Sequence, residues 1–246
     1  MKTTLRTLAL LTMGLIPALA MASHWSYEGE GSPEHWSEVS PENQLCKQGM
    51  NQSPIDINET LKAHINPLKS SYIDSPVNII NNGHTVQAGF AADAKDTVTI
   101  DGVPFQLQQL HFHAPSENTL HGKHYAMEMH LVHKNASGEI AVVAVMFETG
   151  AKNSELDKLW QAMPVKSDEK AELTQNVDVN KLLPKDLSHY RFSGSLTTPP
   201  CSEGVRWLVM KQPETLSIEQ LKQFTSVMHH DNNRPVQQLH GRVVVE

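Results

Sequence analysis

The chain lacks the features of several large protein classes. It carries 20 Lys+Arg against 27 Asp+Glu, a net charge of −7, and it contains no basic run. General nucleic-acid binders usually need a basic face, so the composition argues against nucleic-acid binding. Beyond the N-terminus no apolar stretch is long enough to cross a bilayer, so stable membrane insertion is not expected. No repeat, low-complexity tract or linker divides the 246 residues, and one domain is the simplest organisation.

The N-terminal segment has the composition of a secretory signal. Two basic residues precede an apolar run from Leu8 to Leu19, which leads into an A-x-A signal for cleavage near Ala20 to Ala22. This pattern predicts a signal peptide over residues 1–20 and a mature domain over 21–246. A membrane anchor is the alternative, although the run is short for a bilayer span. We expect export, with the periplasm as the destination.

Cysteine is nearly absent, with only Cys46 and Cys201 in the whole chain. In an oxidising compartment two cysteines are expected to form a disulfide, and two free thiols are the alternative. Neither cysteine has another cysteine or a histidine at ligand spacing, which argues against a cysteine metal site.

Strand signals dominate from residue 77 onward. Alternating or continuously apolar segments bounded by turn residues predict strands over 77–80, 97–100, 105–113, 125–133 and 140–147. Helices are expected over 154–163, with Ser154 as the N-cap, and over 217–228, with Ser217 as the N-cap and Gln220 completing a capping box. Residues 24–58 show no helical period. The predicted fold is mainly β, with one large, mostly antiparallel, twisted central sheet and a few short peripheral helices.

Histidine is abundant, with 14 in the chain, and two lie in one predicted strand. His111 and His113 are two positions apart and therefore point to one face, with Phe112 on the other. The next predicted strand carries His130 on a matching face, whereas His133 points away. Three imidazoles from two adjacent strands can occupy three corners of a tetrahedron and leave the fourth open, as in catalytic zinc sites. Ordinary hydrogen-bonded strand histidines are the alternative.

Two polar residues accompany these histidines. Gln109 precedes His111 by two positions, and Glu128 precedes His130 by two, so each shares a face with its histidine. Metal-bound histidines usually donate their second ring nitrogen to such a group. Taken alone, each residue is more typical of an ordinary polar position on a half-buried sheet face.

Seven segments resemble the signature segments of α-class carbonic anhydrases and follow their order. They are Pro33-Glu-His-Trp36, Gln52-Ser-Pro-Ile-Asp56, Asn82-Gly-His84, Gln109-Leu-His-Phe-His113, Glu128-Met-His-Leu-Val-His133, Ser195-Leu-Thr-Thr-Pro-Pro200 and Asn233-Arg-Pro-Val-Gln237. The similarity covers essentially the whole chain after the N-terminal segment.

The resemblance implies an enzyme for the zinc-dependent, reversible hydration of carbon dioxide to bicarbonate and a proton. One Zn²⁺ would be held by His111, His113 and His130, with Gln109 and Glu128 orienting two of the rings. A zinc-bound hydroxide would attack CO2, and weak hydrolysis of activated esters would be a side activity. Sulfonamides and small anions would inhibit the enzyme, which would be a monomer or a homodimer.

Three further residues receive catalytic roles by resemblance. Thr197 would accept a hydrogen bond from the hydroxide and donate a hydrogen bond of its own to Glu117. His84 would carry the released proton to solvent, because histidine titrates near neutral pH. Taken alone, Thr197 is typical of a turn, Glu117 of a solvated loop and His84 of an exposed side chain.

The remaining implied positions surround these groups. The substrate would meet Val132, Val142, Leu196, Thr198, Val205 and Trp207. Polar positions along the proton path would be Tyr27, Asn82 and Gln87, although the family more often has Asn at the position of Gln87. The resemblance also implies a Cys46–Cys201 disulfide and cis peptide bonds at Ser53-Pro54 and Pro199-Pro200.

Three rival functions make different predictions. A catalytically silent member of the same fold would usually lack a ligand histidine, but all three are present here. A zinc storage or transport protein would release its metal readily and would not need Thr197. A dedicated zinc esterase would need an ester-specific pocket, for which the chain shows no feature.

Overall fold

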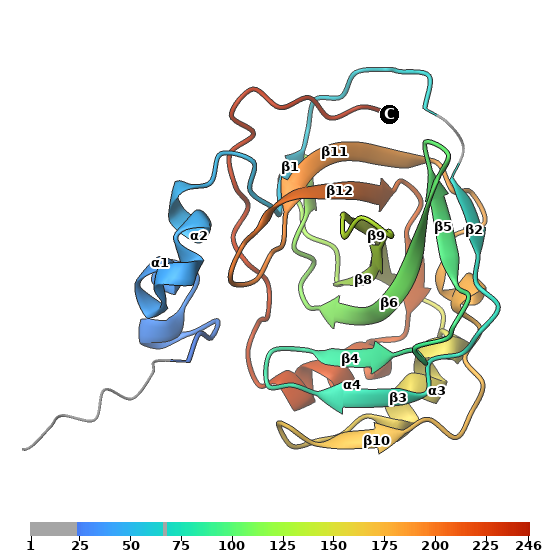
Figure 1. The fold of residues 1–246 in the computed structure, drawn as a ribbon. Coiled ribbons are helices and arrows are strands. Elements are labelled where there is room, and N and C mark those ends of the chain that lie inside the picture. The colour runs from blue at the N-terminus through green and yellow to red at the C-terminus, as the bar shows by residue number, and fades with distance from the viewer. Residues whose placement is uncertain (1–23, 66–67) are drawn as a thin grey trace, which may run out of the picture.

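The centre of the molecule is one large sheet, seen in a computed structural model that describes residues 24–65 and 68–246 (Figure 1). The predicted signal peptide lies outside the described residues. The strands are β1 (Asp56–Ile57), β2 (Lys69–Ser71), β3 (Asn78–Asn81), β4 (Val86–Gly89), β5 (Thr97–Ile100), β6 (Val103–His113), β7 (Thr119–Leu120), β8 (Met127–Lys134), β9 (Ile140–Thr149), β10 (Lys170–Glu172), β11 (His189–Ser195), β12 (Glu203–Met210) and β13 (Glu214–Leu216).

The sheet has 11 strands in the described part of the chain, with the main order β10-β3-β4-β6-β8-β9-β12-β11. The predicted mainly β fold with a mostly antiparallel sheet is confirmed. The sheet is mixed, because β9 pairs in parallel with both β12 and β13. Parallel neighbours need a long crossover connection, and the segment between β9 and β12 contains the helix α3 (Ser154–Ala162).

Strand β6 contains a β-bulge that strand alternation alone did not predict. Its pairing with β8 shifts register between Leu107 and Gln109. Before the bulge the odd-numbered Phe105 and Leu107 face the main core, and after it the even-numbered Leu110 and Phe112 do. An extra residue in one strand reverses the faces of everything that follows. The bulge therefore turns residue 109 and the odd positions after it to the opposite face.

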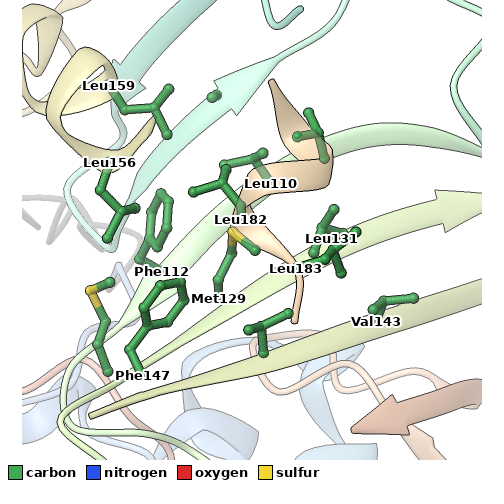
Figure 2. Close-up of a cluster of buried hydrophobic side chains, with 14 of the residues drawn as sticks. Leu110, Phe112, Met129, Leu131, Val143, Phe147, Leu156, Leu159, Leu182 and Leu183 are labelled. Carbon is green, nitrogen blue, oxygen red and sulfur yellow. The ribbon is translucent and has the colours of Figure 1, made fainter. Parts of the chain in front are cut away.

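The main core lies on the face of the sheet that carries Phe112 (Figure 2). Side chains from the three central strands, such as Met129 and Phe147, meet the apolar face of α3 there. The Phe112 ring lies edge-on to Trp160 of α3, with centroids 4.8 Å apart. Burial of such an aromatic side chain contributes about 1.5–3 kcal/mol to the free energy of folding. Packing on this face therefore holds in place the strands that carry the histidines.

The two long helices are close to the predicted ranges. Helix α4 (Ile218–Met228) begins at Ser217, and both hydrogen bonds of the capping box with Gln220 are present, as predicted. Helix α3 is capped by Asn153 rather than by Ser154, because the Asn153 side chain accepts hydrogen bonds from the backbone N–H of Glu155 and Leu156.

The N-terminal region contains short helices that were not predicted, because residues 24–58 show no helical period. They are η1 (Gly29–Gly31), α1 (Trp36–Val39), η2 (Pro41–Asn43) and α2 (Leu45–Gln48), and η3 (Val179–Leu182) lies later in the chain. Elements of three or four residues are too short to show a period of 3.6. Tertiary packing holds them instead: α1 and α2 contribute Trp36 and Cys46 to one small buried cluster, and η3 contributes Val179 and Leu182 to the main core.

The predicted disulfide and cis peptide bonds are present. Cys46 is bonded to Cys201, with Cα atoms 5.1 Å apart. Ser53-Pro54 and Pro199-Pro200 are cis, and Ala114-Pro115 is a third cis bond that was not predicted. Among the described residues, no helix combines the length and apolar character needed to cross a membrane.

Candidate metal centre

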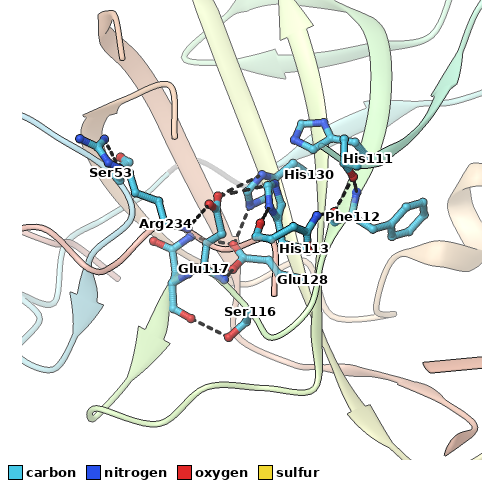
Figure 3. A network of polar contacts seen from close by, with 12 residues as sticks. Ser53, His111, Phe112, His113, Ser116, Glu117, Glu128, His130 and Arg234 are labelled. Atoms are coloured by element: carbon cyan, nitrogen blue, oxygen red, sulfur yellow. Dashed lines mark hydrogen bonds and ion pairs between the residues drawn. The ribbon is translucent and has the colours of Figure 1, made fainter. Parts of the chain in front are cut away.

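Three histidines converge on one point at the face opposite the main core (Figure 3). His111 and His113 come from β6, and His130 comes from β8, directly opposite His111 in the strand register. One ring nitrogen from each lies within 4.8 Å of the others. Within the described part of the chain this is the one cluster of three such side chains with metal-binding spacing. Phe112 points to the other side of the strand, as strand alternation predicted.

The second nitrogen of every ring is held by a hydrogen bond. His111 Nδ1 lies 2.8 Å from Gln109 Oε1, and His130 Nε2 lies 2.9 Å from Glu128 Oε1. His113 Nδ1 donates to the backbone oxygen of Asn232 at 2.6 Å. The atoms left facing the centre are therefore Nε2 of His111, Nε2 of His113 and Nδ1 of His130. His113 Nε2 is buried and has no hydrogen-bond partner among the described residues.

These three nitrogens suit a zinc ion. Burial lowers the pKa of His111, His113 and His130, so the rings are neutral and each offers a lone pair. Tetrahedral zinc accepts three neutral imidazoles, and hydrogen bonds to the outer nitrogens orient the rings. A buried nitrogen with no partner would be costly without a ligand. The three histidines therefore fit a zinc ion.

Glu128 is a buried carboxylate with its own supporting contacts. Its Oε2 accepts from the backbone N–H of Glu117 and of Asn118, both at 2.8 Å, and its Oε1 accepts from the Asn118 side chain at 2.7 Å. Burial raises the pKa of Glu128, whereas these hydrogen bonds lower it. Since Glu128 also holds His130, this carboxylate connects the metal centre to the Glu117 segment.

Glu117 lies fully buried beside the histidines. Its Oε1 accepts from the backbone N–H of Arg234 at 2.9 Å, and its Oε2 lies 3.6 Å from His113 Nε2. Burial raises the pKa of Glu117 to about 8, while the Arg234 backbone N–H and the neighbouring Thr197 hydroxyl lower it. Glu117 Oε2 has no hydrogen-bond partner among the described residues. A cation held by the histidines would favour the ionised form. The structure thus places Glu117 in the site, not in the solvated loop that its sequence context alone suggested.

Thr197 is buried in the loop that follows β11. This loop is fixed at both ends. The backbone N–H and side-chain oxygen of Ser195 exchange hydrogen bonds with Ser53 at 3.1 and 2.9 Å, and the Cys201 N–H donates to Thr198 O at 2.9 Å. The loop that carries Thr197 is therefore fixed, and the Thr197 hydroxyl lies close enough to Glu117 to lower the pKa of that carboxyl group.

The predicted substrate positions form one apolar cluster. Val142, Val205 and Trp207 are buried, and Val132 and Leu196 are partly buried against them. The Trp207 ring lies edge-on to His130, with centroids 5.0 Å apart. Thr198 is half-buried in the loop next to Thr197. An apolar wall thus reaches the metal centre.

His84 lies in the turn between β3 and β4, and β4 is the strand next to β6. The Asn82 side-chain oxygen accepts from the backbone N–H of His84 at 3.0 Å, and Gln87 lies opposite His111 in the strand register. The His84 ring is half-buried against Trp25. Burial is the main cause that lowers its pKa to about 4, which differs from the near-neutral titration expected from the sequence. Tyr27 is buried close by, and burial raises its pKa.

One residue central to the site was not identified from the sequence. The Asn232 backbone oxygen accepts from His113, and its side chain donates to the backbone oxygens of His84 and Phe112 at 3.0 and 2.9 Å. Asn232 directly precedes the Asn233-Arg-Pro segment that resembles the family, and that position was the available signal.

Comparison with known proteins agrees with this site. The sequence model of the eukaryotic-type carbonic anhydrase family matches residues 31–246. The chain belongs to this family. The carbonic anhydrase of Klebsiella pneumoniae is 62% identical over 246 residues, covering 100% of both chains. The general reaction of the family is carbon dioxide hydration, and this chain is an enzyme of that kind.

Solved carbonic anhydrases share the fold. The α-carbonic anhydrase of Thermovibrio ammonificans, in complex with sulfanilamide, has a TM-score of 0.89 at 49% identity and covers 91% of this chain and 99% of its own. The α-carbonic anhydrase of Photobacterium profundum has a TM-score of 0.86 at 47% identity, covering 91% and 100%.

Proposed function

We propose that this chain hydrates carbon dioxide reversibly with one Zn²⁺ held by His111, His113 and His130. The observation that carries the proposal is the ring arrangement: three neutral imidazole nitrogens lie within 4.8 Å, and each ring is fixed from behind by a hydrogen bond. Zinc held in this way acts as a Lewis acid that makes water a nucleophile near neutral pH.

Thr197 and Glu117 set the direction of attack. A hydroxyl group can donate one hydrogen bond, and in this proposal Thr197 donates it to an ionised Glu117. The oxygen of Thr197 is then left as an acceptor, so it orients the nucleophile by accepting a hydrogen bond from it. Positioning of this kind lowers the barrier by fixing the reacting atoms before the reaction.

The apolar cluster holds the substrate. Carbon dioxide is small and carries no net charge, so it needs an apolar wall beside the nucleophile rather than a charged clamp. Val142, Val205 and Trp207 provide this wall, and the partly buried Val132 and Leu196 pack against it. We assign the half-buried Thr198, next to Thr197 in the loop, to the same substrate site.

Proton release is assigned to His84, with Tyr27, Asn82 and Gln87 as polar groups along the path. The supporting observation is one of position: the Asn232 backbone oxygen accepts from His113, and the Asn232 side chain donates to the His84 backbone oxygen, which fixes the turn that carries His84 beside the metal centre. We further infer export to the periplasm after removal of residues 1–20, for which the Cys46–Cys201 disulfide is supporting evidence. Sulfonamides are proposed inhibitors because the Thermovibrio relative is complexed with one.

The test is a stopped-flow measurement of CO2 hydration by the zinc-loaded enzyme, with zinc content measured on the same sample. We expect rapid hydration that stops on chelation and on addition of sulfanilamide. A folded protein with one bound zinc and no CO2 hydration would refute the proposal. Hydrolysis of an activated ester should be present but weak, and an ester rate that exceeds CO2 hydration would favour a dedicated esterase.

A further inference from the structure

Two of the segments that resemble the family have no role in the proposed reaction, and they meet at the side chain of Arg234. This side chain is among the largest fully buried ones of the described chain. Its Nη1 donates to Gln52 Oε1 at 2.9 Å and to the Ser53 backbone oxygen at 2.8 Å (Figure 3). Its Nη2 donates to the Cys46 backbone oxygen at 2.8 Å. These three oxygens are uncharged, so the contacts position the guanidinium rather than neutralise it.

The backbone of Arg234 contacts the site itself. Its N–H donates to Glu117 Oε1 at 2.9 Å, whereas Glu117 Oε2 has no hydrogen-bond partner among the described residues. With one oxygen held, the position of this N–H determines where the other oxygen points. Oε2 is the atom left for the Thr197 hydroxyl in the proposed mechanism.

The dipeptide that accepts from the guanidinium also holds both ends of the Thr197 loop. At one end, the Ser53 N–H donates to Ser195 Oγ at 2.9 Å, and the Ser195 N–H donates to Ser53 Oγ at 3.1 Å. At the other end, the Gln52 side chain donates to the Cys201 backbone oxygen at 3.1 Å. The arginine therefore contacts the support of this loop with its side chain and the buried carboxylate with its backbone.

We propose that Arg234 is a positioning residue that sets the placement of Glu117 relative to Thr197. The inference rests on the proposed function, in which this pair orients the nucleophile. A planar guanidinium fork fixes two segments at once, and a misplacement of about 1 Å can slow an enzyme reaction by up to about 10²-fold. Loss of the guanidinium should therefore slow the reaction while all three zinc ligands remain.

The activity test is a double-mutant cycle between Arg234→Met and Thr197→Val. It measures kcat/KM for CO2 hydration, with zinc content checked for each protein. Arg234→Met should lower kcat/KM about tenfold in the unmodified chain, but less than about twofold when residue 197 is already valine. The reason is that a positioning effect disappears together with the hydroxyl that is positioned.

Equal losses in both backgrounds would overturn the inference, and so would an unchanged kcat/KM in the folded Arg234→Met protein. If the methionine variant does not fold, Arg234→Lys takes its place in the same cycle. Lysine keeps the charge but lacks the planar fork that reaches several oxygens, so the same pattern of losses is expected. The same two outcomes would overturn the inference for this variant.

Arg242 provides the matched control. Its guanidinium donates to the backbone oxygens of Gln52 and Ser193 at 2.8 and 2.9 Å, but its backbone N–H donates to Leu239 O and not to Glu117. Arg242→Met should therefore lower stability yet keep kcat/KM within about twofold in both backgrounds. A loss of kcat/KM as large as that in Arg234→Met would reveal a general structural effect and overturn the inference.

A second readout needs neither zinc nor activity. Amide hydrogen exchange, followed by NMR on the metal-free chain, reports the paired hydrogen bonds of Ser53 and Ser195. We expect these two amides to exchange about tenfold faster in Arg234→Met than in Arg242→Met. Equal exchange in the two variants would overturn the inference. Absence of CO2 hydration in the unmodified zinc-loaded enzyme would instead overturn the proposed function, and the exchange result would still decide whether Arg234 holds these segments.

Discussion

His111 and His130 lie directly opposite each other across strands β6 and β8, with ring centroids 5.2 Å apart and planes at 90°. This cross-strand pair fixes two of the three ligands in a rigid part of the sheet. His113 joins them from the same strand as His111, with its ring 4.7 Å from that of His130. A metal in this site is therefore bound by preformed strands rather than by loops.

Replacing one of these rings should remove tight zinc binding. We expect His130→Ala to retain no stoichiometric zinc after dialysis, because two imidazoles cannot hold the ion as three do. Metal analysis by mass spectrometry measures the zinc, and circular dichroism checks the fold. His64→Ala, at an exposed histidine, should keep one zinc per chain. Full zinc occupancy in folded His130→Ala would place the ligands elsewhere.

The residues that hydrogen-bond to the outer nitrogens of the three histidine rings should affect zinc affinity, although they are not zinc ligands themselves. Gln109→Ala removes the hydrogen bond to His111 Nδ1, and we expect zinc affinity to fall about 10–100-fold. The matched control is Gln108→Ala, since the Gln108 side chain bonds only to the backbone oxygen of Gln106 in the contacts resolved here. Competition with a chelator measures both affinities. Equal affinities in the two variants would contradict a role for Gln109.

Thr197 should matter for the reaction but not for the metal. Thr197→Val removes the hydroxyl beside Glu117 at nearly constant volume, and we expect kcat/KM to fall by roughly 10²-fold. Zinc content should remain at one per chain. Thr197→Ser keeps the hydroxyl and should retain most of the activity, which separates the effect of hydrogen bonding from that of packing. Activity in the valine variant equal to that of the serine variant would remove Thr197 from the mechanism.

Strand periodicity predicted the local geometry of the site well. The alternation placed His111 and His113 on one face and Phe112 on the other, because a side-chain period of two holds within any uninterrupted strand. It did not predict the bulge between Leu107 and Gln109, which depends on the pairing with β8. Alternation therefore assigned the faces of His111, Phe112 and His113 correctly relative to one another. It could not relate those faces to that of Phe105, which lies before the bulge.

Contacts between segments that lie far apart in the chain could not be predicted from local sequence patterns. Asn232 lies 119 positions from His113, and Glu117 receives its hydrogen bond from Arg234, 117 positions away. No spacing rule connects such residues, and only the family resemblance placed Glu117 in the site.

His133, the second histidine of β8, leads to a prediction about the stability of the folded chain at acid pH. His133 is fully buried on the core face, where its Nε2 shares a hydrogen bond of 2.9 Å with the Tyr72 hydroxyl. Burial is the main cause that lowers the pKa of His133 to about 4, whereas an unfolded chain has the ordinary value near 6.5. Between these values the unfolded chain binds a proton that the folded chain does not.

Stability should therefore fall as the pH drops from 6.5 to 4, and this residue should not contribute to pH dependence above 6.5. The shift corresponds to a loss of roughly 3 kcal/mol across that window. Urea unfolding at several pH values measures it, and His133→Gln should show a smaller decrease between pH 6.5 and 4 than the unmodified chain. The comparison cancels the contribution of the other buried histidines, because both proteins contain them. Parallel stability curves for the two proteins would show that His133 is not the residue that titrates.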